Sequence, residues 1–174
     1  MLTEKQLNWI KHLSDDDKIV IKPCDPKAIK KFNIVKKKIQ KFLGKKIPIV
    51  HRGASNLGIS GQDEIDIYIP VSKNKFNKTL NQLKKFFGLP ASLYALERAR
   101  FVTSQGSKYT TVSLMNNSHS GWINGEKFEK YLRSHPTSLE AYRLLKEKGN
   151  GLSVREYYRR KLEFINEILT KENI

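Results

Sequence analysis

The feature that most constrains the fold is a pair of β-like segments with a loop of small residues between them. Strands are expected at 47–51 and 64–70, and the second segment alternates apolar and polar residues. Such alternation is typical of a strand with one buried face. The connection, from His51 to Asp63, is rich in glycine, serine and alanine. The pattern predicts two strands of a β-sheet, joined by a turn that a ligand can approach closely.

The rest of the chain predicts further strands and several helices. Strands are expected near 19–21, 99–104 and 109–115, and a Gln105-Gly106-Ser107 turn is expected to join the last two as a hairpin. Helices are expected at 3–14, from Asp25 to Gly44, and at 74–87, 125–134, 137–148 and 153–170. We therefore expect a single α/β (α+β) domain over 1–174, with a mixed β-sheet flanked by helices and a helical C-terminal third.

Capping signals mark the starts of four of these helices. A short polar side chain at the start of a helix accepts a hydrogen bond from a backbone N–H, and proline fits the first helical position. The signals are Thr3 with Gln6, Asp25 before Pro26, Thr137 with Glu140, and Ser153 with Glu156.

The chain carries a large excess of positive charge, with 33 lysine and arginine residues against 17 acidic ones. The formal net charge of +16 favours a phosphate-rich partner, either a nucleotide or a nucleic acid, although scattered lysines also form ordinary solvated surfaces. No apolar stretch reaches the roughly 18 residues of a membrane span, so no membrane association is expected. A single cysteine, Cys24, and the lack of a secretory signal pattern favour the cytoplasm.

Two carboxylates fall at alternate positions of the strand expected at 64–70. Side chains two residues apart on a strand point to the same face, so Glu64 and Asp66 are expected side by side. A divalent cation relieves their repulsion, and hard oxygen ligands suit Mg²⁺. The pair therefore predicts a metal site, with Glu64 and Asp66 as catalytic residues of nucleotidyl or phosphoryl transfer. The solvent-facing rim of an ordinary sheet carries the same pattern, and that interpretation stays open.

The loop before this strand has residue types that suit phosphate. Glycine lets backbone N–H groups approach a phosphate closely, and a serine hydroxyl can bind its oxygens. The candidate phosphate-binding residues of the loop are Gly53, Ser55, Asn56 and Gly58. His51 precedes them and is a candidate for facing the phosphate or donating a proton, with a structural hydrogen bond as its alternative role.

Three arginines in the C-terminal third are further candidates for phosphate binding. They are Arg133, Arg155 and Arg159, and the last two lie four residues apart, so they share one side of a helix. Ion pairs with neighbours such as Glu156 and Glu163 are an equal alternative.

Several motifs, in the same order along the chain, resemble the GrpB family. They are Ile21-Lys22-Pro23-Cys24-Asp25-Pro26, the stretch from His51-Arg52-Gly53-Ala54-Ser55 to Ile65-Asp66-Ile67, and Phe128-Glu129-Lys130-Tyr131-Leu132-Arg133-Ser134-His135-Pro136. The likeness covers about 19–170, and His51 matches a histidine of that family. The resemblance implies the fold of the nucleotidyltransferase superfamily. Most members of the GrpB family lack an assigned reaction.

The sequence also departs from the family pattern. Ala54 stands where the family has a serine, and Glu64 replaces an apolar residue, which moves the site toward the paired acids of active nucleotidyltransferases. Thr111 and Ser113 correspond to a His-x-His strand of the family, so two imidazoles are missing. Between Arg98 and Gly125 there is no acidic residue, so this segment offers no third carboxylate.

Three functions are compatible with these residues. The first is Mg²⁺-dependent transfer of a nucleotidyl or phosphoryl group from a nucleoside triphosphate to an acceptor. The second is a catalytically inactive module that binds a nucleotide or RNA through the same fold. The third is an accessory or chaperone-like domain that acts on another protein.

Overall fold

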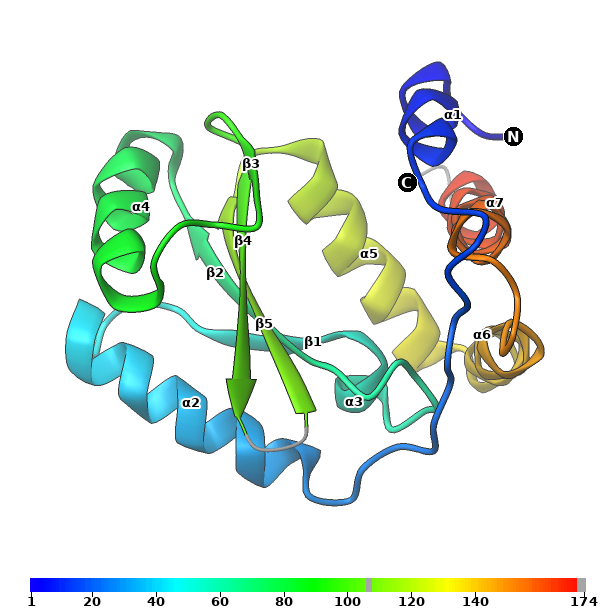
Figure 1. The fold of residues 1–174 in the computed structure, drawn as a ribbon, viewed down its shortest axis with the longest axis horizontal. Coiled ribbons are helices and arrows are strands. Elements are labelled where there is room, and N and C mark those ends of the chain that lie inside the picture. The colour runs from blue at the N-terminus through cyan, green and yellow to red at the C-terminus, as the bar shows by residue number, and fades with distance from the viewer. Residues whose placement is uncertain (106–107, 172–174) are drawn as a thin grey trace. The chain divides into compact units, whose positions relative to one another are not determined.

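A five-stranded mixed β-sheet is the framework of the protein (Figure 1). The computed structural model describes residues 1–105 and 108–171. In chain order the strands are β1 (Val50–Arg52), β2 (Ile65–Val71), β3 (Ser92–Tyr94), β4 (Arg98–Gln105) and β5 (Lys108–Asn116). The helices of the described chain are α1 (Glu4–Lys11), α2 (Ala28–Leu43), α3 (Gly53–Leu57), α4 (Lys73–Phe87), α5 (Ser120–Ser134), α6 (Pro136–Lys148) and α7 (Val154–Lys171). The mixed α/β class expected from the sequence is confirmed.

The chain divides into two compact units. One, which we call the sheet unit, comprises Cys24–Gly58 and Asp63–Ile123 and contains all five strands with α2, α3 and α4. The other, the helical unit, comprises Met1–Pro23, Ile59–Gln62 and Asn124–Ile174 and contains α1, α6 and α7. The boundary at Ile123 falls within α5.

The strand order in the sheet is β1-β2-β5-β4-β3. Strands β2 and β5 are parallel, whereas the other neighbours are antiparallel. In the central pair Asp66 lies beside Thr111 and Ile67 beside Val112. Because successive side chains alternate between faces, this register separates an apolar face from a polar one. The apolar face includes the fully buried Ile67, Ile69, Leu114 and Val112.

Helices α2 and α4 cover the apolar face and complete the core of the sheet unit. Helix α2 contributes Phe32, Val35 and Ile39, whose spacing of three and four residues puts them on one side of the helix. Helix α4 contributes Phe76, Leu80 and Leu83 by the same rule. Lysines are the commonest residues at the remaining positions, so both helices are strongly amphipathic. As expected, α2 ends at Gly44, where φ is +105°.

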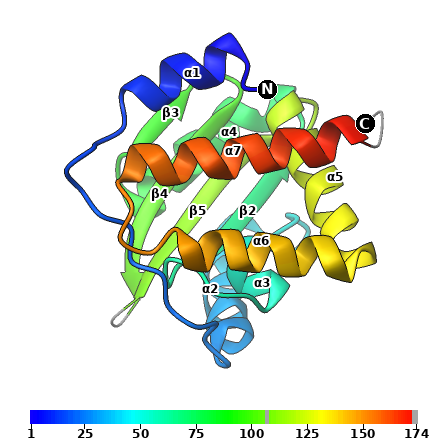
Figure 2. The ribbon, with the colours of Figure 1, turned by 90° about the vertical axis from the view of Figure 1, so that its right-hand side faces the viewer.

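The helical unit is held by aromatic packing and by side-chain caps. Figure 2 shows α1, α6 and α7, and α7 packs against the other two. Trp9 of α1 meets Tyr158 of α7 edge to face at 5.4 Å, and Tyr142 of α6 stacks on Phe164 at 5.4 Å. The expected capping box of Thr3 and Gln6 is confirmed, and Ser153 accepts a hydrogen bond from the N–H of Glu156 at 3.2 Å.

Several expected boundaries are wrong. Residues 19–21 form no strand, because the adjacent chain makes only the isolated bridges Lys18↔Ser153 and Lys22↔Gly61. Strand β3 was not expected, and its three residues are too few to show a period. Helix α5 begins at Ser120, five residues before the expected start. The strand expected at 47–51 is confirmed only as the shorter β1, which comprises Val50–Arg52.

Two capping expectations also need correction. Helix α2 begins at Ala28, and Pro26 lies in the preceding turn, where the Asp25 carboxylate accepts a hydrogen bond from the N–H of Lys27 at 2.9 Å. Helix α6 begins at Pro136 rather than after Thr137, because proline already fits the first helical position. Strands β4 and β5 pair as expected, whereas residues 106 and 107 of the expected turn lie outside the described residues.

Within residues 1–105 and 108–171, no helix combines the length and apolar character needed to cross a lipid bilayer.

The packing of α2 predicts a large difference between two of its isoleucines. Ile39 is fully buried in the core, whereas Ile29 is 63% exposed on the same helix. We expect Ile39→Ala to lower the free energy of unfolding by about 2–5 kcal/mol, because it leaves a cavity. Ile29→Ala should change it by no more than about 0.5 kcal/mol. Urea unfolding followed by circular dichroism measures both, and equal effects would contradict the described packing.

Candidate functional site

The carboxylate of Asp66 is fixed on the polar face of β2. Thr111, beside it on β5, donates a hydrogen bond from Oγ1 to Asp66 Oδ1 at 2.6 Å. On the other side the carboxylate lies against Gly53, the first residue of α3. A methyl group on Gly53 would lie 3.1 Å from Asp66 Cγ and closer still to Oδ2, and φ of Gly53 is +77°. Only glycine fits this position without strain.

Arg52 places a positive charge on the same face of the sheet. It lies directly opposite Asp66 in the antiparallel pair of β1 and β2. Its guanidinium lies over the rings of Trp122, at 5.1 Å, and Tyr68, at 5.7 Å. The arginine side chain is largely buried, so these aromatic faces hold it in place. Arg52 follows His51 directly on β1, so the two side chains point to opposite faces of the sheet.

His51 points to the opposite face from Asp66. It pairs with Ile67 in the register, and its ring stacks on Phe32 of α2 with centroids 4.7 Å apart. Its Nε2 lies 3.0 Å from Ser55 Oγ. The structure therefore does not bring the His51 ring together with Asp66, and the ring lies in polar contact with Ser55 of α3.

The expected loop after His51 is in part a helix. Gly53, Ser55 and Asn56 all lie within the single short helix α3, so the structure brings these three candidate phosphate-binding residues together. Gly58 ends α3 in the left-handed conformation, and its N–H donates to the carbonyl of Ala54. Gly58 thus acts as a helix cap.

Glu64 lies immediately before β2 rather than within it, so the strand expected from 64 begins one residue later. The preceding residue, Asp63, has φ of +62°, so its backbone is left-handed and not in the extended conformation of a strand. No group of three or more His, Cys, Asp or Glu residues that could hold a metal occurs among the described residues. Binding of a metal by Glu64 and Asp66 stays a prediction.

The three candidate arginines belong to the helical unit. Arg159 is paired with Glu156 at 2.7 Å and Glu163 at 2.8 Å, and Arg155 is paired with Asp15. Arg155 also donates to the carbonyl of Leu13 at 2.8 Å. Arg133 lies in α5. For Arg155 and Arg159 the structure shows the ion pairs that were the alternative to phosphate binding.

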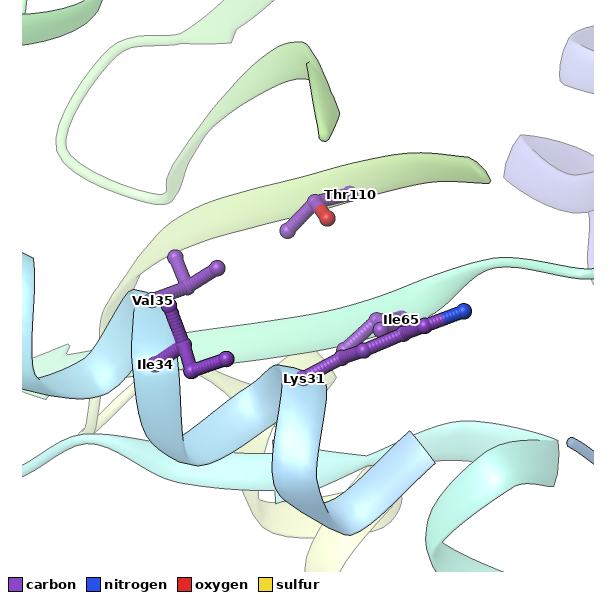
Figure 3. A pocket seen from close by; sticks show the side chains of 5 residues that line it. All are labelled: Lys31, Ile34, Val35, Ile65 and Thr110. Carbon is purple, nitrogen blue, oxygen red and sulfur yellow. The ribbon is translucent and has the colours of Figure 1, made fainter. Parts of the chain in front are cut away.

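A hollow of about 190 Å³ lies on the other side of the sheet, between α2 and the beginnings of β2 and β5 (Figure 3). Its lining is mostly aliphatic, and its one charged residue, Lys31, is paired with Asp25 at 2.9 Å. Ligand pockets usually exceed about 300 Å³. We therefore place the candidate site at Asp66 and α3 and not at this hollow.

Thr111, like Arg52, lies at the site but was not predicted from the sequence to belong to it. In the sequence Thr111 only stands in place of a histidine of the GrpB family, whereas in the structure Thr111 orients the Asp66 carboxylate. The two residues are 45 positions apart, so periodicity alone gives no sign of their contact. The one available signal was its place in the family pattern, directly beside the expected acidic strand.

These features define a mixed α/β protein with an aspartate held against the glycine that begins a short helix. Residues 18–171 match the GrpB protein family, and the chain therefore belongs to that family. The crystal structure of conserved protein GrpB from Enterococcus faecalis has a similar fold, with a TM-score of 0.68 and 16% sequence identity. The similarity covers 89% of this chain and 100% of that one. None of the curated proteins compared matches the chain.

Substitution of alanine for two glycines of the site is expected to lower the free energy of unfolding by different amounts. Gly53→Ala and Gly58→Ala both put a side chain at positive φ, but only the first meets Asp66. We expect Gly58→Ala to cost about 1 kcal/mol of unfolding free energy, and Gly53→Ala about 2–3 kcal/mol. Adding Asp66→Ala to Gly53→Ala should recover part of the loss. Chemical unfolding of the unmodified protein and these three variants tests this, and equal costs for the two glycines would contradict the close approach.

The ion pairs of α7 predict a shifted titration for Glu156. Hydrogen bonds from Arg159 and Arg160 lower the pKa of Glu156 from 4.5 to about 2. Because the folded-state pKa is lowered, its stabilising contribution is present above pH 4.5 and is lost as the pH falls toward 2. NMR titration of the side-chain carboxyl should show the low value, and Arg159→Gln should raise it. An ordinary pKa in the unmodified protein would contradict the pairing.

Proposed function

We propose that this GrpB-family protein catalyses Mg²⁺-dependent transfer of a nucleotidyl or phosphoryl group from a nucleoside triphosphate to an acceptor, in the cytoplasm. The observation that carries the proposal is the approach of the Asp66 carboxylate to Gly53 at the start of α3. An oriented carboxylate next to a glycine at the start of a helix is an arrangement that suits a metal-bound phosphate. The resemblance to the nucleotidyltransferase superfamily supports the same reaction class.

The oxygen donors of the site fit Mg²⁺. An ionised carboxylate has about four acceptor positions, and the hydrogen bond from Thr111 uses one of those on Asp66. Glu64, two residues earlier in the chain, would supply the second carboxylate. Mg²⁺ typically takes one or two carboxylates and completes its shell with water and substrate phosphates, so two acids suffice. When bound, the ion would neutralise charge on the transferred group.

The residues around Asp66 would position the substrate. Thr111 holds the carboxylate in one orientation, so little reorganisation is needed when a charged ligand arrives. Gly53 lets the Asp66 carboxylate lie close to the start of α3, and Ser55 supplies a hydroxyl that the contact with His51 orients. His51 is therefore a positioning residue in this proposal. Arg52 adds a fixed positive charge on the face where the phosphates would bind.

A second candidate function is binding of the nucleotide without transfer. The observation that favours it is the polar face of β5, where Thr111 and Ser113 stand beside Asp66 and Tyr68 of β2. Neither β4 nor β5 contains an acidic residue, so these strands add no carboxylate to Asp66. A protein of this kind would hold the phosphates and release them unchanged.

Replacement of Asp66 predicts the loss of transfer. With a panel of labelled nucleoside triphosphates, Mg²⁺ and candidate acceptors, we expect the unmodified protein to turn over at least one triphosphate. Asp66→Asn should lower this rate by about 100-fold or more, because the amide is a poor metal ligand. Asp63→Asn is the matched control: it removes one nearby charge, tolerates positive φ, and should retain most of the activity.

Two results would decide against transfer. Turnover that survives Asp66→Asn would exclude Asp66 as the metal ligand. Binding of a non-hydrolysable triphosphate by calorimetry, with no turnover of any triphosphate, would support the second candidate function instead.

A further inference from the structure

The positive charge is concentrated in the sheet unit. Of the 33 lysine and arginine residues, 18 lie in this unit together with only 5 of the 17 acidic residues. The helical unit has the remaining 15 basic and 12 acidic residues and is close to balanced. Within the sheet unit, α2 and α4 contain eleven lysines and no acidic residue. A net charge this localised is a stronger indication of an anionic partner than the charge of the whole chain.

Neither α2 nor α4 can neutralise its lysines within its own turns. On α6 and α7, arginines pair with glutamates three or four residues away, as Arg143 does with Glu140 and Arg159 with Glu163. Such pairs need an acid on the same helix, and α2 and α4 have none. Their exposed lysines therefore add to a common positive potential.

The two helices present these lysines on the same side of the sheet. Both lie on the same side of the sheet (Figure 1). Each packs onto the apolar face of the sheet through one stripe of hydrophobic residues. Lys37 and Lys41 of α2, and Lys78 and Lys85 of α4, lie outside those stripes and are exposed. The core contacts thus leave the lysines directed to solvent.

Two phenylalanine rings join the ends of these helices at the surface. Phe42 of α2 stacks on Phe86 of α4, with centroids 4.8 Å apart and planes inclined at 29°. Their exposed fractions are 43% and 38%, so the stacked pair is only partly covered. Lys41 and Lys85 are their direct neighbours in the chain. We call Lys37, Lys41, Phe42, Lys78, Lys85 and Phe86 the lysine–phenylalanine surface.

We propose that the lysine–phenylalanine surface binds single-stranded nucleic acid. Exposed aromatic rings offer a face on which unpaired bases stack, and lysines of the same two helices bind the phosphates. A duplex hides its bases, so it would leave the two rings unused. Two partly covered rings among four lysines also give little apolar area for insertion into lipid. This site is independent of the proposed transfer reaction, because it uses no residue of the Asp66 site.

Binding of a fluorescent twelve-residue oligouridine by the full chain tests the proposal. Anisotropy titrations at several salt concentrations should show affinity that falls as salt rises. The double variant Phe42→Leu and Phe86→Leu keeps apolar volume but removes the rings, and should weaken binding by about tenfold with an unchanged salt dependence. Changing the four lysines to glutamine should weaken binding and reduce the slope of log affinity against log salt by about three.

A matched control removes the same charge from the helical unit, with glutamine at the exposed Lys11, Lys127, Lys130 and Lys148. This variant, and Asp66→Asn, should bind the oligonucleotide as the unmodified protein does. The proposal is overturned by no binding at low salt, or by an equal loss in the control variant. Binding to duplex DNA or to phosphatidylserine vesicles without binding to oligouridine would also overturn it. Failure of transfer with retained binding would affect the proposed function alone.

Discussion

The contact between Asp66 and Gly53 links three elements of the sheet unit. The aspartate is on β2, the glycine begins α3, and Thr111 of β5 fixes the carboxylate from the other side. A side chain at position 53 would separate α3 from the strand, and a residue unable to donate at position 111 would free the carboxylate. The geometry of the candidate site therefore depends on Asp66, on the small size of Gly53 and on the hydrogen bond from Thr111.

The sheet performs two tasks with its two faces. One face is apolar and carries the core under α2 and α4, while the other places Asp66, Arg52 and Thr111 together. Alternation along β2 is what allows both, because buried isoleucines on one side fix the orientation of the polar residues on the other. A shift of register by one residue would move Asp66 into the core, so the hydrophobic packing also secures the site.

The sequence predicted most of the secondary structure and part of the site. Strands β2, β4 and β5 and the longer helices follow from clear periodicity, and the family resemblance was confirmed by the match over 18–171. Three misses have local causes: β3 is too short to show a period, α3 begins at a glycine, and Asp63 turns the chain just before Glu64. The contact of Thr111 with Asp66 is long-range, and no pattern within either strand reveals it.

The lengths of the strands bear on how the molecule avoids self-association. The outermost strands, β1 and β3, have only three residues each, whereas the interior strands have seven, nine and eight. An exposed strand edge can recruit a strand from another molecule, and the gain grows with the number of backbone hydrogen bonds formed. Three-residue borders offer few such bonds. The longest strand, β5, lies between β2 and β4, where another chain cannot add to it. Strand β3 pairs only with Arg98–Arg100 of β4, so the rest of β4 is the stretch on which an added strand would gain most bonds.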